Sequence, residues 1–266
     1  MQKNVWYAVI VVAVVIVIAG AYMFTSSGGS PSSLVDKPVS VAQLSQLEAI
    51  ALDSTLANNV GAGSTTNGGH PNYPTVIDDN ALVINGKVGV VYISADFCPY
   101  CAINRWGLII ALMRFGNFTG LQYMQSGASP EIYPSTSTFT FSNSSYSSSN
   151  IYFDAVETAS VNGSSLGTPD ALQTSLLKKY DKGGSIPFTD FGNRSVLVGS
   201  VASPQSLQGS DWTQIIAQLN NTNSPISQSV IGSANIFTAY ICRTGLGGIG
   251  NESACKQAYV RNINGA

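Results

Sequence analysis

The stretch from Lys87 to Phe115 constrains the fold most, because its pattern indicates a buried strand that runs directly into a helix. Residues 88–93 are mostly β-branched or aromatic and contain no proline, which is typical of a buried strand. From Cys98 onward the apolar residues recur at three- and four-residue steps, and Pro99 suits a first helical turn. The pattern therefore predicts that Cys98 and Cys101 lie at a helix N-terminus.

The motif Cys98-Pro-Tyr-Cys101 has the spacing of a redox dithiol. Free N–H groups and the helix dipole stabilise a thiolate at Cys98, so we expect its pKa to fall from roughly 8.5 toward neutrality. Cys98 would attack a disulfide, and Cys101, one helical turn deeper, would resolve the mixed disulfide. A purely structural disulfide across this turn is the alternative. Asp96 is close enough to serve proton transfer at the dithiol, but its position fits a solvated strand end equally well.

The composition limits the kinds of partner. The chain has 266 residues, of which 44% are hydrophobic, enough for one sizeable domain. Only 10% of the residues are charged and the net charge is -2, so nucleic acid is excluded as a partner. A surface of uncharged polar groups suits an acidic exterior or a glycan-covered one. The four cysteines form two close pairs, a pattern typical of an oxidising compartment.

The N-terminal region contains an uncharged apolar run from Val5 to Phe24. At about 1.5 Å per residue the run is just long enough to cross a membrane. Lys3 before it favours a cytoplasmic N-terminus, which places the domain on the extracytoplasmic side of the cell membrane in a single-pass topology. A cleaved signal peptide is the competing interpretation, because residues 19–21 are small. We divide the chain into an anchor or signal segment at 1–24, a flexible tether at 25–38 and a domain at 39–266.

Periodicity predicts the remaining elements of that domain. We expect a helix over 39–56, a loop over 58–74, and strands at 81–84 and 121–124. An inserted β-hairpin at about 126–166 should contain strands at 136–141 and 151–156. After it we expect a helix capped by Thr168 and ending near 180, two strands around the Gly192-Asn193 turn, and helices at 211–219, 225–242 and 253–261. The Asn85-Gly86 turn joins the strand at 81–84 to the next strand. His70, the only histidine, fits a solvated loop residue better than a ligand.

The second cysteine pair, Cys242 and Cys255, encloses a glycine-rich loop of twelve residues. A bridge that closes such a loop stabilises a fold by roughly 3 kcal/mol in the chain-entropy model. We therefore favour a structural disulfide over a second redox pair. Six sequons are compatible with N-glycosylation outside the cell, those of Asn117, Asn143, Asn162, Asn193, Asn220 and Asn251. Asn117, after a buried helix, and Asn193, in a tight turn, are the least suitable.

The order of elements resembles the thioredoxin superfamily. The resemblance rests on Ala95-Asp-Phe-Cys-Pro-Tyr-Cys101 between strand and helix, and on Ile186-Pro187 at the start of a later strand. It implies an α/β thioredoxin-like fold, with a central mixed sheet flanked by helices, the inserted hairpin, and a helical C-terminal extension at about 225–266. It also implies that Pro187 is cis and lies beside Cys98. A proline at the first residue of a strand is allowed without a cis bond as well.

The sequence segments at 114–119, 136–141 and 186–193 more specifically resemble a largely archaeal, membrane-anchored thioredoxin-like family called domain of unknown function 929. This resemblance spans about 39–242 and implies a fold and a dithiol but no substrate. Our hypothesis is a membrane-anchored thiol-disulfide oxidoreductase without cofactor, which acts on exported proteins with thiols or disulfides and has a redox partner. One alternative is a module that binds Cu(I) through Cys98 and Cys101, although no histidine or methionine lies close to them in sequence. Another is a non-catalytic surface domain.

Overall fold

The computed structural model describes residues 33–64, 66–67, 70–77 and 79–263. The expected anchor at 1–24 and most of the expected tether lie outside these residues. Among the helices that are described, none is both long and apolar enough to cross a membrane. From Asp36 onward the described residues belong to one compact unit, which contains all the helices and strands named here.

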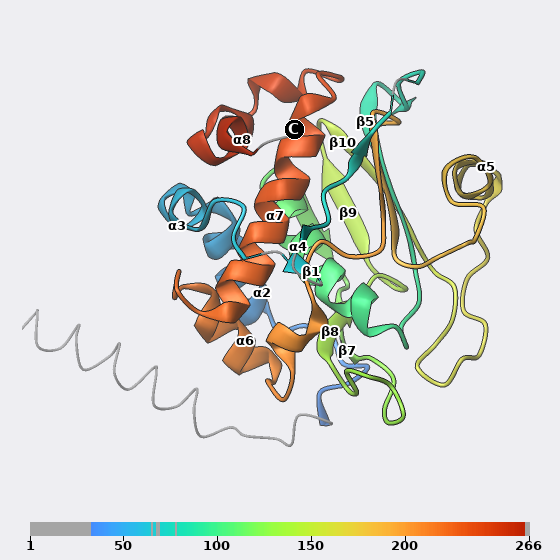
Figure 1. Ribbon diagram of the computed structural model, residues 1–266, viewed down its shortest axis with the longest axis vertical. Helices are drawn as coiled ribbons and strands as arrows, with labels where there is room; N and C mark the ends of the chain where they lie inside the picture. Colours follow the sequence, from blue (N-terminus) through green and yellow to red (C-terminus); the bar gives the residue numbers. More distant parts are fainter. Residues whose placement is uncertain (1–32, 65, 68–69, 78, 264–266) are drawn as a thin grey trace, which may run out of the picture. The chain divides into compact units, whose positions relative to one another are not determined.

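A mixed sheet with strand order β10-β5-β11-β12-β3 forms the centre of this unit (Figure 1). The central strand β5 pairs in parallel with β10 and antiparallel with β11, and β4 pairs with its first residues. The strand bounds are Thr75–Val76 for β3, Val83–Ile84 for β4, Lys87–Ser94 for β5, Ile151–Glu157 for β10, Phe188–Phe191 for β11 and Ser195–Val198 for β12. The predicted central mixed sheet is confirmed, as is the turn at Asn85-Gly86 that joins β4 to β5.

Helices cover both faces of the sheet, which explains why β5 is buried from residue 88 to 94. Phe188 packs in an apolar cluster with Leu176 of α5 (Ala171–Tyr180) on one face. On the other face, Phe191 stacks on Phe237 of α7 (Pro225–Arg243), with ring centroids 5.6 Å apart. The cysteine-containing helix α4 (Pro99–Met113) packs against α7 on this second face. Both sides of β5 therefore require apolar residues, as its composition indicates.

The smaller helices cover the remaining surface. Their bounds are Val41–Leu52 for α2, Ser54–Val60 for α3, Trp212–Leu219 for α6 and Ala258–Asn262 for α8, with short 3-10 turns η2 (Pro204–Leu207), η3 (Ile249–Asn251) and η4 (Ser253–Lys256). The single helix expected over 39–56 is wrong, because the carboxylate of Asp53 accepts the Leu56 N–H at 2.9 Å and starts a new helix. The expected cap at Thr168 is also wrong, since Asp170 caps α5 in a capping box with Gln173.

The prediction of an inserted β-hairpin at about 126–166 is wrong. Residues 137–140 (β8) pair with β7 (Gln122–Gln125), and residues 145–148 (β9) pair with β6 (Gly116–Thr119). Residues 151–157 form β10, the parallel neighbour of β5, and not the second arm of a hairpin. The segment at 136–141 instead packs on α4, where Phe139 lies 4.6 Å from Trp106 between ring centroids. Alternation predicts a strand but does not identify its partner.

The segment expected as a loop at 58–74 contains more structure than predicted. Helix α3 continues to Val60, and β1 (Thr66–Asn67) pairs with β2 (His70–Pro71). The expectation for the side chain of His70 lies outside what the structure describes.

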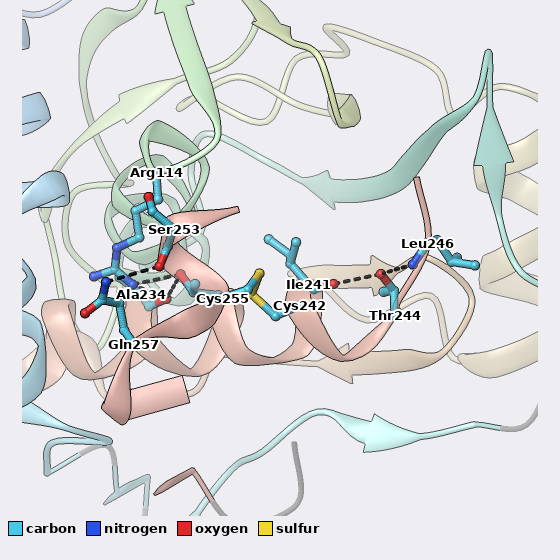
Figure 2. The surroundings of a disulfide bond; sticks show 10 residues. Arg114, Ala234, Ile241, Cys242, Thr244, Leu246, Ser253, Cys255 and Gln257 are labelled. Carbon is cyan, nitrogen blue, oxygen red and sulfur yellow. Dashed lines mark hydrogen bonds between the residues drawn. A yellow bond between two sulfur atoms is a disulfide. The ribbon is translucent and has the colours of Figure 1, made fainter. Parts of the chain in front are cut away.

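The C-terminal segment is tied to α7 by a disulfide between Cys242 and Cys255, with the Cα atoms 5.4 Å apart (Figure 2). The bridge joins the last turn of α7 to η4 and closes the glycine-rich loop, as expected for a structural pair. Among the sequon asparagines, Asn117 is exposed in contrast to our expectation. Asn193 is half-buried, and its amide donates to Asn80 O at 2.5 Å, so it is less accessible.

Candidate redox site

Cys98 is the N-cap residue of α4, and Pro99 occupies the first helical turn, as predicted. The backbone N–H of Cys101 donates to Cys98 Sγ at 3.3 Å, so the sulfur takes the place of the oxygen that usually caps a helix. Both thiols are free. Cys98 retains 7% of its surface and Cys101 none. Only Cys98 can therefore meet a partner from solvent without rearrangement.

The two thiols differ in acidity. The hydrogen bond from the Cys101 side chain lowers the pKa of Cys98 to about 7, and the Cys101 N–H and the positive charge of Arg105 act in the same direction, against the effect of burial. Burial, together with the neighbouring Cys98, raises the pKa of Cys101 well above its ordinary value. At neutral pH the pair therefore loses its first proton from Cys98, the thiol at the surface.

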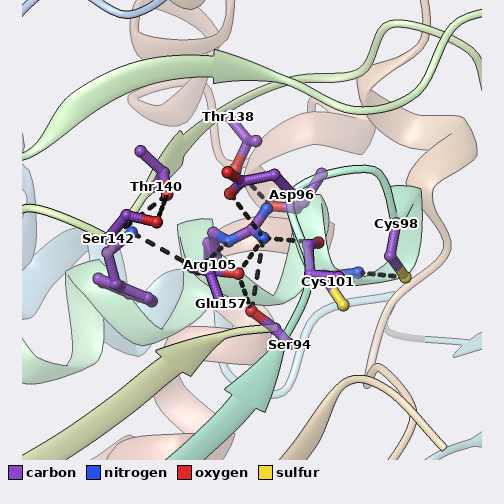
Figure 3. Close-up of polar contacts among 12 residues, drawn as sticks. Ser94, Asp96, Cys98, Cys101, Arg105, Thr138, Thr140, Ser142 and Glu157 are labelled. Carbon is purple, nitrogen blue, oxygen red and sulfur yellow. Dashed lines mark hydrogen bonds and ion pairs between the residues drawn. The ribbon is translucent and has the colours of Figure 1, made fainter. Parts of the chain in front are cut away.

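A buried arginine lies behind the dithiol. Arg105 comes one helical turn after Cys101 on α4 and has no exposed surface. Its Nε and Nη2 donate to the two carboxylate oxygens of Glu157 at 2.9 and 2.7 Å, a bidentate pair. Nη2 also donates to Ala95 O at 2.8 Å and reaches Asp96 Oδ1 at 3.5 Å. Figure 3 shows Arg105 among these acceptors, with Cys101 and then Cys98 on the other side.

The carboxylates of this cluster come from two strand ends. Glu157 is the last residue of β10, opposite Ser94 at the end of β5, and the Ser94 hydroxyl donates to it. Asp96 follows β5, and its N–H donates to Ala159 O at 2.8 Å. The parallel pairing of β5 and β10 thus brings both acids to the same edge of the sheet, where the side chain of Arg105 ends. The parallel register, which the sequence did not predict, assembles the cluster.

Asp96 is not a solvated strand end, because only 2% of its surface is exposed. Burial raises the pKa of Asp96 to about 6, although the charge of Arg105 opposes the shift. Asp96 also lines a surface hollow of about 540 Å³ together with Asp36, Met124 and Thr140. It therefore connects the buried cluster to the outside, and its pKa allows it to take up and release a proton near neutral pH.

Pro187 lies at the same end of the sheet as the dithiol. The Ile186-Pro187 peptide bond is cis, as the resemblance implied. Phe188, the next residue, pairs with Ile93 near the end of β5, from which the chain continues to Cys98. The carbonyl of Pro187 accepts the Gly199 N–H at 2.8 Å.

An aromatic rim adjoins Cys98. Tyr100 and Tyr133 make an edge-to-face contact with ring centroids 6.0 Å apart, and Phe97 O accepts the Gly127 N–H at 2.8 Å. These contacts hold the segment 127–135 beside the motif, with Ile132 76% exposed. Part of the surface beside the thiol is thus built from a segment about thirty residues further along the chain.

Sequence reasoning identified Cys98, Cys101, Asp96 and Pro187 but missed Arg105 and Glu157. A signal for Arg105 existed, since a charge four residues after Cys101 on an otherwise apolar helix must share its face. No local signal identified Glu157, because its partner is set by the pairing of β10 with β5. Within the part of the chain that the structure describes, no group of three or more His, Cys, Asp or Glu side chains is placed to hold a metal ion.

The comparisons with known proteins bear on one part of the chain. No curated protein and no solved structure matches it. One family model matches residues 73–180, a span that includes the dithiol, Asp96, Arg105 and Glu157 but neither Pro187 nor the second cysteine pair. Over these residues the chain is similar to the domain of unknown function DUF929, the family that its sequence phrases resemble.

Proposed function

We propose that this protein is a thiol-disulfide oxidoreductase in which Cys98 is the nucleophile. The observation that carries the proposal is the position of Cys98 Sγ at the N-cap of α4, where it accepts the Cys101 N–H at 3.3 Å. A thiolate is stabilised there by the N-terminal N–H groups and the dipole of the helix. The second thiol lies three residues further on, buried and protonated.

The reaction follows from this asymmetry. The Cys98 thiolate attacks one sulfur of a substrate disulfide, an S–S bond forms between them, and the other substrate sulfur leaves and takes up a proton. Cys101 then loses its proton and attacks Cys98 Sγ, which releases the second substrate sulfur as a thiol. Two electrons have passed from the dithiol to the substrate, and Cys98 and Cys101 are joined. The same steps in reverse oxidise a substrate dithiol.

The cluster behind the dithiol supports the second step. Cys101 must give up a proton in a fully buried position, which is costly unless positive charge lies nearby. Arg105 supplies that charge and is held in place by Glu157. Asp96, at the edge of the surface hollow, is the group that accepts the proton and passes it to solvent.

The sheet supports a thioredoxin-like fold as part of the proposal. The cysteine-containing helix follows the central strand β5, β10 is parallel to that strand, and a cis proline precedes the antiparallel strand β11.

We further propose that the apolar run at 5–24 anchors the protein in the cell membrane with the domain outside, where exported proteins with thiols or disulfides are its substrates. Protease added to intact cells should then digest the domain; protection until lysis contradicts this topology.

Trapping tests the function. In a Cys101→Ser variant the resolving thiol is missing, so mixed disulfides between Cys98 and substrate proteins should accumulate and run as larger species without reductant. Cys98→Ser is the matched control and should trap nothing. If the Cys101→Ser variant traps no protein from an extract of the exported proteins of the cells that produce it, the proposal is contradicted.

A further inference from the structure

Helix α4 ends at a second buried arginine, which forms no ion pair among the described residues. Arg114 is the C-cap residue of α4 and is 7% exposed. Arg105 on the same helix faces two carboxylates, whereas no Asp or Glu among the described residues forms an ion pair with Arg114. Removing an unpaired cation from water costs several kcal/mol. Within the part of the chain that the structure describes, Arg105 therefore has carboxylate partners and Arg114 has none.

The guanidinium of Arg114 has neutral neighbours and one spare donor. Nε donates to Ala51 O at 3.1 Å, Nη1 to Ala234 O at 3.3 Å and to Thr238 Oγ1 at 2.7 Å, and Nη2 to Asn235 Oδ1 at 2.8 Å. A guanidinium has five N–H donors, so one N–H on Nη2 has no acceptor within the described residues. The ring of Tyr259 lies over the group, with its centroid 4.9 Å from Cζ, and covers one face.

A small cavity adjoins this group. Its volume is about 40 Å³, and its lining includes Arg114, the hydroxyl-bearing Ser54 and Ser253, and the amide-bearing Gln257. A single water needs roughly 10–15 Å³ measured in this way, so a cavity of this size has room for one halide ion. Figure 2 shows Arg114 close to Ser253 and Gln257, on the side of α7 where the disulfide lies.

We propose that this cavity binds one small monoatomic anion, with the size and charge of chloride, on Arg114. The anion would accept the spare N–H of Arg114 and supply the missing counter-charge. Two lining residues, Ser253 and Ala254, belong to η4, which contains Cys255, so the bridge from Cys242 ties this part of the cavity to α7. The site is independent of the redox proposal, because none of its residues belongs to the dithiol or the cluster behind it.

Thermal unfolding of the full chain in a chloride-free methanesulfonate buffer, titrated with sodium bromide, tests the proposal. Binding to the folded state raises Tm with the logarithm of the bromide concentration above Kd, by about 5–10 °C at one hundred times Kd. Arg114→Met should abolish this rise, while Arg261→Met, which removes an exposed charge on α8, should retain it. If Arg114→Met does not fold, Gln257→Leu, which fills the cavity from its rim, takes its place.

Anomalous diffraction from bromide-soaked crystals gives the direct readout and should show a peak beside Arg114 Nη2. No rise of Tm with bromide in the wild type together with no peak at this position overturns the proposal and assigns the cavity to water. A rise as large as that of the wild type in Arg114→Met, or in Gln257→Leu where the first variant does not fold, overturns it as well.

Discussion

Replacing Glu157 with glutamine should strongly destabilise the protein, because it removes the main counter-charge of a fully buried arginine. Both Glu157 oxygens accept from Arg105, at 2.9 and 2.7 Å, and both side chains are almost completely buried. Breaking a buried pair from one side costs about 3–5 kcal/mol, since the remaining charge is left uncompensated. For a domain of this size that corresponds to a fall in Tm of roughly 6–20 °C. The remaining carboxylate, Asp96, contacts Nη2 only at 3.5 Å and does not replace the bidentate pair.

Equilibrium urea unfolding at pH 7, followed by the fluorescence of the buried Trp106 and Trp212, measures the effect. Removing both charges in Arg105→Met/Glu157→Gln should recover at least about 2 kcal/mol of the loss, because no uncompensated cation then remains. Lys179→Met is the matched control, since it breaks a solvent-screened pair whose lysine is 55% exposed and should change the stability little. A cost for Glu157→Gln as small as that of the control, or a double variant as unstable as the sum of its parts, would refute the reasoning.

Two further predictions concern pH and the second cysteine pair. The pKa of Asp96 is raised in the folded state to about 6, so the folded protein binds the proton more tightly and loses stability, on the order of 2 kcal/mol, as pH rises from about 4 to about 6. Burial raises the pKa of Asp190 to about 7, so Asp190 changes the stability with pH in the same direction. Comparing the unfolding free energies of the wild type and Asp96→Asn in urea at both pH values isolates the effect of Asp96. An equal change of unfolding free energy with pH in the two proteins would contradict the prediction. Replacing both Cys242 and Cys255 with Ala should lower the unfolding free energy by about 3 kcal/mol and leave the rate of dithiol exchange unchanged. Unchanged stability with lost exchange would instead make this pair a redox relay.

The local parts of the site were predictable from the sequence. The strand β5, the start of α4 at Cys98 and the buried position of Cys101 all follow from residues within one short stretch, where periodicity and the cap act directly. The sequence also indicated the disulfide of Cys242 with Cys255, because only one close partner was available to each.

The non-local parts were not predictable. Whether residues 151–157 pair with β8 or with β5 depends on the packing of the whole sheet, and local alternation carries no information about it. That pairing places Glu157 opposite Ser94 and so completes the cluster around Arg105. The helix caps formed by Asp53 and Asp170 are local features. They were missed because several polar residues near each helix start can serve as the cap, and the sequence alone does not show which of them accepts the first free N–H groups.

The acidity of Cys98 tests the central claim most directly. Alkylation of the reduced protein with iodoacetamide, measured from pH 5 to 10 and read out by mass spectrometry of each cysteine, gives the apparent pKa of the thiol that reacts. Cys98 should be labelled first, with a pKa of about 7, while Cys101 stays unlabelled in the folded protein. Equal labelling of the two cysteines, or a Cys98 pKa at or above the roughly 8.5 of a free thiol, would contradict it.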